Sequence, residues 1–154
     1  MHLRLIAVGD RQPSWVDAAV TDYARRLPRQ WQFRVEAIAS AKRAGSAARA
    51  MADEAGRLLG KLQKNERLVL LDERGRAFSS RAIADRLGSW QADGRDVAFV
   101  IGGADGVDRS VAERADESWS LSSLTLPHGI ARILVVEQLY RAWSLSTGHP
   151  YHRD

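Results

Sequence analysis

The residues best suited to bind or transform a ligand gather in the last third of the chain. Gly102 and Gly103 directly follow a strand-like apolar run at Val97–Ile101, and glycines there would let a ligand approach the main chain closely. A polar loop at residues 121–127 comes next, and the chain ends in a polar tail that carries two histidines. If the chain builds one pocket, we expect this part of the sequence to form it.

Three apolar runs end in polar or glycine-containing segments, at Leu71, Ile101 and Leu121. Ligands of open α/β sheets bind outside the carboxyl ends of the strands, where backbone groups are exposed. The three strand ends therefore predict one shared pocket. Gly102 and Gly103 could instead only make a tight turn before a helix, and their spacing alone leaves both interpretations open.

The long apolar segment at residues 128–146 carries two polar pairs with helical spacing, His128 with Arg132 and Glu137 with Arg141. A glutamate and an arginine four residues apart also form ordinary surface ion pairs, so Glu137 and Arg141 have a purely structural alternative. Apolar residues cover much of the circumference of this expected helix. A second subunit is the simplest partner for the part that the sheet leaves uncovered.

Several classes of site are excluded or disfavoured. The chain has no cysteine, which rules out disulfides and thiolate chemistry. His149 and His152 have no cage of carboxylates around them in the sequence, so we predict no metal site, and a frayed tail is their structural alternative. Residues 102–106 do not match the dinucleotide-binding pattern, and residues 56–61 are one residue short of a phosphate-binding loop.

Short apolar runs alternate with segments of helical period, which predicts an α/β fold with a mainly parallel sheet flanked by helices, in a single domain over residues 1–154. We expect helix N-caps at Ser14, at Ser79 or Ser80, and at Asp108. The sequence at residues 72–75 indicates a turn. The expected strands are residues 3–8, 33–38, 67–71, 97–101 and 119–121, and the last helix is expected over residues 128–146.

The net charge of +4 is mild, although arginine, which suits phosphate contacts, outnumbers lysine. The first eight residues lack the pattern of a signal peptide, and no apolar segment is long enough to span a membrane. We therefore expect a cytoplasmic protein.

Four segments together resemble the small rRNA methyltransferases of the SPOUT superfamily: residues 101–106 (IGGADG), 121–128 (LSSLTLPH), 137–143 (EQLYRAW) and 149–152 (HPYH). More narrowly, the whole chain resembles the RlmH family of large-subunit pseudouridine N3-methyltransferases. Each motif is weak alone, but their order, their spacing and the matching chain length make the set specific.

The resemblance implies S-adenosylmethionine as methyl donor, no metal, a homodimer and a C-terminal trefoil knot. It also implies that the substrate is a pseudouridine in a stem-loop of 23S rRNA, modified on the assembled ribosome. Two alternatives stay open: a non-catalytic ribosome-associated RNA-binding protein with the SPOUT fold, and a SPOUT methyltransferase that acts on tRNA.

Carried over by position, the resemblance assigns the donor pocket to Leu71, Gly102, Gly103, Leu121, Ser122, Ser123, Leu124, Thr125 and Leu126. For the acceptor and its proton we expect His128, Arg132, Arg141, Tyr151, His152 and Arg153, with the tail of one subunit closing over the donor of the other. Lys42, Arg43 and Arg49 are expected phosphate contacts, and their alternative is a solvated surface.

Overall fold

The computed structural model describes residues 1–42 and 45–153, so Arg43, an expected phosphate contact, lies outside the described residues. The strands are β1 (Leu3–Val8), β2 (Arg34–Ile38), β3 (Arg67–Ala77), β4 (Val97–Ile101) and β5 (Glu117–Ser120). The helices are α1 (Ser14–Arg26), α2 (Ala47–Lys61), α3 (Ser80–Asp93), α4 (Arg109–Arg114) and α5 (His128–Thr147), with a short 3₁₀ helix at Arg29–Trp31.

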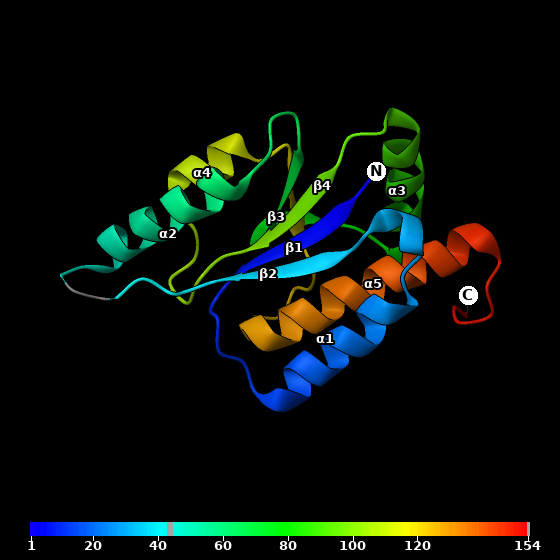
Figure 1. Ribbon diagram of the computed structural model, residues 1–154, viewed down its shortest axis with the longest axis horizontal. Helices are drawn as coiled ribbons and strands as arrows, with labels where there is room; N and C mark the ends of the chain where they lie inside the picture. The colour runs from blue at the N-terminus through cyan, green and yellow to red at the C-terminus, as the bar shows by residue number, and fades with distance from the viewer. Residues whose placement is uncertain (43–44, 154) are drawn as a thin grey trace.

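The strands form one parallel sheet in the order β2-β1-β4-β3-β5. Helices α1, α3 and α5 cover one face of it, and α2 and α4 cover the other (Figure 1). Every residue of β1 and β4 is buried, because both strands are central and lie between two helical layers. The predicted α/β fold with a parallel sheet is thus confirmed.

The side chains of the central strands alternate between two cores. Leu5 and Phe99 face the layer of α1, α3 and α5, whereas Ile6 and Val100 face the layer of α2 and α4. Helix α5 packs between α1 and α3 on the first of these faces. This position places the start of α5 at the carboxyl ends of the strands, where the loops meet.

The turn predicted at residues 72–75 is wrong, because β3 runs through this segment to Ala77. Both Leu71 and Arg76 pair with Trp119 of β5, so the residues between them form an irregular bulge in the ladder. Gly75 permits this close approach: a Cβ at this position would lie 2.7 Å from backbone atoms of Ser118 and Trp119.

The helix N-caps agree with the sequence except at α1. Ser79 and Asp108 cap α3 and α4 as predicted, accepting hydrogen bonds from Ala82 N at 3.1 Å and Ser110 N at 3.0 Å. The N-cap predicted at Ser14 is wrong, because Ser14 is already helical and Pro13 takes the cap position. The extended backbone of Pro13 turns its carbonyl toward the first free amides of the helix.

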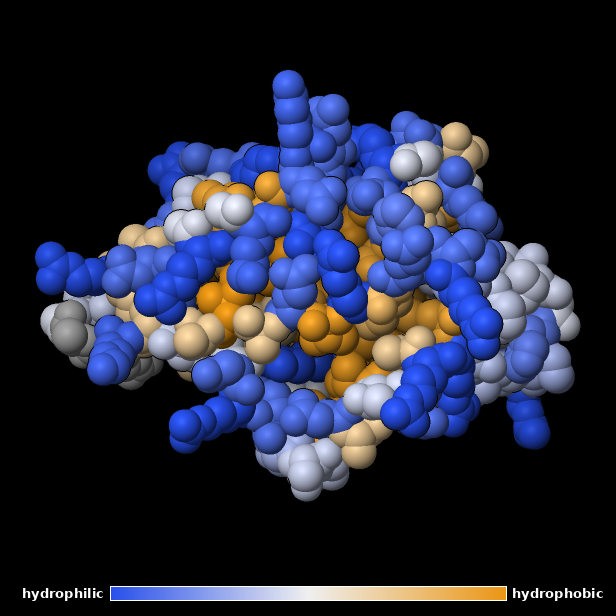
Figure 2. All heavy atoms as spheres, in the orientation of Figure 1, coloured by the Kyte–Doolittle hydropathy of each residue, from blue (hydrophilic) through white to orange (hydrophobic). Residues whose placement is uncertain are grey.

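Helix α5 is the most enclosed helix of its layer, yet it is not fully covered. Val136 and Leu139 are buried against the sheet, while Ile130, Ile133 and Leu134 are only half-buried. Figure 2 shows hydrophilic side chains over most of one face, with hydrophobic atoms visible between them. Among residues 1–42 and 45–153, no helix has the length and apolar character needed to cross a membrane.

Candidate functional site

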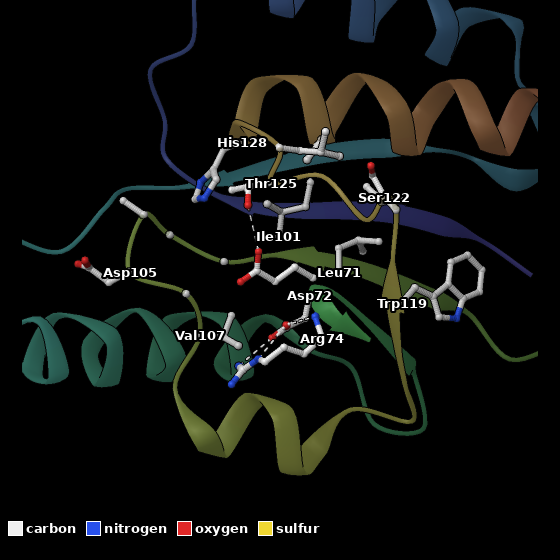
Figure 3. A pocket seen from close by; sticks show the side chains of 18 of the residues that line it. Leu71, Asp72, Arg74, Ile101, Asp105, Val107, Trp119, Ser122, Thr125 and His128 are labelled. Carbon is white, nitrogen blue, oxygen red and sulfur yellow. Dashed lines mark hydrogen bonds and ion pairs between the residues drawn. The ribbon is translucent and has the colours of Figure 1, made fainter. Parts of the chain in front are cut away.

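The bulge of β3 and the carboxyl ends of β4 and β5 border a cavity of about 520 Å³, which the loop at residues 121–127 and the start of α5 also line (Figure 3). The structure thus brings the three strand ends singled out in the sequence around one space. Thr125 and His128 lie on the α5 side of the cavity, and Arg74 and Val107 lie on the side of α2 and α4.

The expected donor-binding residues gather at this cavity, with one exception. Ser123 is exposed on the same loop and does not line the cavity. The others all do: Leu71, Gly102, Gly103, Leu121, Ser122, Leu124, Thr125 and Leu126.

The two glycines after β4 are closely packed against side chains of the same chain. A Cβ at Gly102 would collide with the Val107 side chain, and a Cβ at Gly103 would lie 2.5 Å from Glu54 Oε2. Gly106 N donates to Gly103 O at 3.0 Å, which closes a tight turn. The two interpretations of Gly102 and Gly103, a tight turn and a ligand-binding segment, are therefore compatible, since both glycines also present their backbone to the cavity.

Acidic side chains on the β3 bulge form a polar wall that the sequence interpretation missed. Asp72 is paired with Arg74 at 3.1 Å, and the hydrogen bonds from Arg74 hold the pKa of Asp72 below its ordinary value. Glu73 Oε2 accepts a hydrogen bond from Thr125 Oγ1 at 3.5 Å. The sequence feature that could have revealed this polar wall is the position of residues 72–74 directly after a buried apolar run. Arg74 neutralises Asp72, so the wall presents the Glu73 carboxylate beside the apolar surface of Leu71, which suits a ligand that has a ring and a positive charge.

His128 is the first residue of α5 and lines the same cavity. Burial lowers its pKa, the positive charge of Arg132 lowers it further, and the charge of Glu54 opposes both effects. The imidazole is therefore neutral at pH 7 and can accept a proton.

Arg132, one turn further along α5, is buried and does not line the cavity of about 520 Å³. Its Nη2 donates to the carbonyl oxygens of Val8 and Gly9. The structure thus places Arg132 as a support for the end of β1.

The other expected acceptor residues lie at the opposite end of α5. Arg141, His152 and Arg153 line a second cavity of about 350 Å³, together with side chains from the start of α3. Arg141 is thirteen residues beyond His128 on the same helix, which is about 20 Å along the helix axis. Within one chain, the expected acceptor residues are therefore divided between two places.

Tyr151 lines neither cavity but packs into an aromatic cluster. Its ring centroid is 4.5 Å from that of Tyr140 and 6.4 Å from that of Tyr23. Burial raises the pKa of Tyr151 well above its ordinary value, and the hydrogen bonds to Tyr23 and Glu137 raise it further. The phenol keeps its proton at physiological pH, so Tyr151 can orient a base but cannot take a proton from it.

Two of the expected phosphate contacts, Lys42 and Arg49, are exposed around the amino end of α2. Among the described residues, no group of three or more histidine or acidic side chains is placed to hold a metal ion.

Comparison with known proteins identifies the family. Residues 1–152 match the family model described as "Predicted SPOUT methyltransferase". The chain is 49% identical to the ribosomal RNA large subunit methyltransferase H of Laribacter hongkongensis over 100% of both chains. It is 48% identical to the protein of that name from Burkholderia thailandensis, over 99% of each chain.

Among solved structures, a probable methylase family protein from Haemophilus influenzae Rd KW20 shares the fold, with a TM-score of 0.58 at 11% identity, over 99% of this chain and 70% of that chain. The chain therefore belongs to the SPOUT methyltransferase family and, within it, to the ribosomal RNA large subunit methyltransferase H proteins.

Proposed function

We propose that this protein transfers a methyl group from S-adenosylmethionine to N3 of a pseudouridine in a stem-loop of 23S rRNA, on the assembled ribosome. The observation that supports the proposal most strongly is the cavity at the β3 bulge and the ends of β4 and β5, in a chain of the SPOUT methyltransferase family. The relatives named above are large-subunit rRNA methyltransferases, which supports the choice of substrate.

The donor cavity fits S-adenosylmethionine in size and chemistry. A volume of about 520 Å³ lies within the range of roughly 300–1,000 Å³ typical of small-molecule sites. Leu121 and Leu126 offer apolar surface to the adenine, and the Glu73 carboxylate suits the positive charge of the donor, since Asp72 is already paired with Arg74. Bound there, S-adenosylmethionine supplies an activated sulfonium methyl, so the protein has to provide in-line placement and a pocket poor in water.

The acceptor needs a group that takes the N3 proton and groups that stabilise the resulting anion. His128 and His152 are the candidate proton acceptors, Arg141 and Arg153 can stabilise the anion, and Tyr151 can orient the base. Since these groups are divided between the two ends of α5, we propose a homodimer in which the tail of one protomer closes over the donor cavity of its partner.

Exposed apolar side chains support a contact between subunits near the donor cavity. Leu124, on the rim of the donor cavity, is 71% exposed, and Trp15, at the start of α1, is 57% exposed. Large apolar side chains left open near a site are typical of an interaction surface. The trefoil knot implied by the family remains part of this proposal, as does a cytoplasmic location.

Recognition of RNA is proposed to depend on the shape of the ribosome, because the net charge of +4 provides few phosphate contacts. The exposed Lys42 and Arg49 are the proposed contacts to the RNA backbone.

Donor binding is tested with two matched arginine substitutions in the loop at residues 121–127. Leu126→Arg is expected to fill the cavity and to weaken binding of S-adenosylmethionine at least ~100-fold, because a long charged side chain replaces an apolar wall. Ser123→Arg is the control and is expected to leave the Kd within about twofold of the wild-type value, since Ser123 is exposed outside the cavity. Isothermal titration calorimetry measures both.

Absence of binding to the wild-type protein would favour the non-catalytic RNA-binding alternative. Equal binding by Leu126→Arg and the wild-type protein would place the donor elsewhere.

A further inference from the structure

The C-terminal tail is attached to α5 by two polar side chains that have no part in the proposed chemistry, Glu137 and Ser144. Neither lines the donor cavity, to which α5 contributes His128 and Ala131. Each bonds a different tail residue, Tyr151 in one case and His152 in the other.

The Glu137 carboxylate holds Tyr151 and Arg141 in a fixed relation. Its Oε1 accepts from Arg141 Nη2 at 2.7 Å, from Arg141 Nε at 3.0 Å and from the Tyr151 phenol at 2.9 Å. Its Oε2 accepts from Gln138 Nε2 at 2.7 Å. The Arg141 guanidinium also lies 5.1 Å from the centre of the Tyr151 ring. An ordinary ion pair between Glu137 and Arg141 would not require the hydrogen bond from Tyr151 or the contact of Arg141 with the Tyr151 ring.

Ser144 constrains the imidazole of His152. The Ser144 side chain is fully buried, and its hydroxyl donates to the carbonyl of Arg141 at 2.9 Å. The same oxygen is 3.0 Å from His152 Nδ1. A hydroxyl has one proton, and once it is given to the carbonyl, only the lone pairs remain for His152. Nδ1 must then carry the hydrogen, which leaves the lone pair of the neutral ring on Nε2.

We propose that Glu137 and Ser144 are positioning residues that preorganise the tail: Glu137 fixes Tyr151 beside Arg141, and Ser144 fixes His152 in the Nδ1–H tautomer with Nε2 free to accept a proton from the RNA base. The catalytic meaning of this arrangement rests on the proposed function. Its structural meaning, a tail held in one geometry and one tautomer, can be tested without any substrate.

The chain offers a matched control for each residue. Glu113 pairs with Arg109 on α4 at the same helical spacing and the same 2.7 Å as Glu137 with Arg141. Ser146 donates to the carbonyl three residues before it, at 2.8 Å, as Ser144 does, but it is exposed. Among the described residues, neither control side chain has a hydrogen bond to the tail.

Glu137→Gln and Ser144→Ala are each expected to lower kcat on ribosomal particles about 10-fold or more, the effect of losing one well-placed hydrogen bond. The Kd for S-adenosylmethionine should stay within about twofold in both variants, because neither residue lines the donor cavity. Glu113→Gln and Ser146→Ala should keep kcat within about twofold.

The tautomer is read directly from the ¹⁵N chemical shifts of His152 in the full-length protein, at a pH where the ring is neutral. The proposal requires Nδ1–H in the wild-type protein and loss of that preference in Ser144→Ala. A wild-type ring protonated mainly on Nε2 overturns the role of Ser144, whether or not the variant folds. Unchanged kcat in Glu137→Gln overturns the role of Glu137. If the wild-type protein methylates no ribosomal particle, the proposed function fails, and the tautomer still decides the positioning role.

Discussion

Removal of residues 149–154 is expected to abolish methylation of ribosomal RNA while sparing the binding of S-adenosylmethionine. The tail supplies His152 and Arg153 to the second cavity and Tyr151 to the aromatic cluster beside it. None of residues 149–153, the part of the tail that the structure describes, lines the donor cavity of the same chain, so the donor keeps its walls. Loss of proton transfer and of base orientation together should reduce turnover by about 10³-fold or more.

Calorimetry and a methylation assay on ribosomal particles measure the two arms of this prediction. A full-length variant with alanine at Tyr151, His152 and Arg153 is the control for chain length, and it should lose activity to the same extent. Thermal unfolding of both proteins tests whether the fold, including α5, is retained without the tail. Turnover at the full-length rate after truncation would contradict the proposed acceptor site.

Gly75→Ala is expected to destabilise the protein by about 3 kcal/mol, because the added methyl group has no room to move away. The new Cβ would lie 2.7 Å from the backbone of Ser118 and Trp119, and backbone atoms, unlike a flexible side chain, cannot rotate aside. β3 and β5 would have to separate at the bulge. Because Leu71 and Trp119 line the donor cavity, binding of S-adenosylmethionine should weaken as well.

Urea unfolding measures the change in stability, with Gly88→Ala as the control. Gly88 is exposed inside α3, and a Cβ there meets nothing within 4 Å. Alanine at this position is expected to raise stability by up to about 1 kcal/mol, through its higher helix propensity. If Gly75→Ala unfolds at the wild-type urea concentration, the close approach of β3 to β5 is not as the structure has it.

The sheet could be predicted from the sequence where its signal is local. The uninterrupted apolar runs of β1 and β4 indicate strands buried on both faces, and the structure buries every residue of both. Residues 72–75 carry the opposite local signal, that of a turn. They belong to β3 only because Arg76 and Ala77 pair with residues of β5 far along the chain. Pairing of that kind leaves no local trace in the sequence.

The candidate site could also be predicted from the sequence only in part. The common position of the strand ends followed from the rule for parallel sheets, so the surroundings of Leu71 and Gly102 could be anticipated. Helical spacing related Glu137 to Arg141 but gave no sign of Tyr151 as a further partner, because the tail is placed by contacts with Tyr23 and Tyr140. Spacing also could not show that the Arg132 side chain turns inward to the end of β1.

The central claim, methyl transfer to N3 of a pseudouridine in 23S rRNA, is tested most directly on ribosomal particles from cells that lack the modification. The particles are incubated with the protein and S-adenosylmethionine, and the rRNA is then digested to nucleosides for mass analysis. We predict that N3-methylpseudouridine appears in large-subunit rRNA from assembled particles and is nearly absent when an isolated RNA hairpin is the substrate. Unmethylated rRNA from particles treated with a donor-binding protein, or methylation of tRNA in its place, would contradict the account.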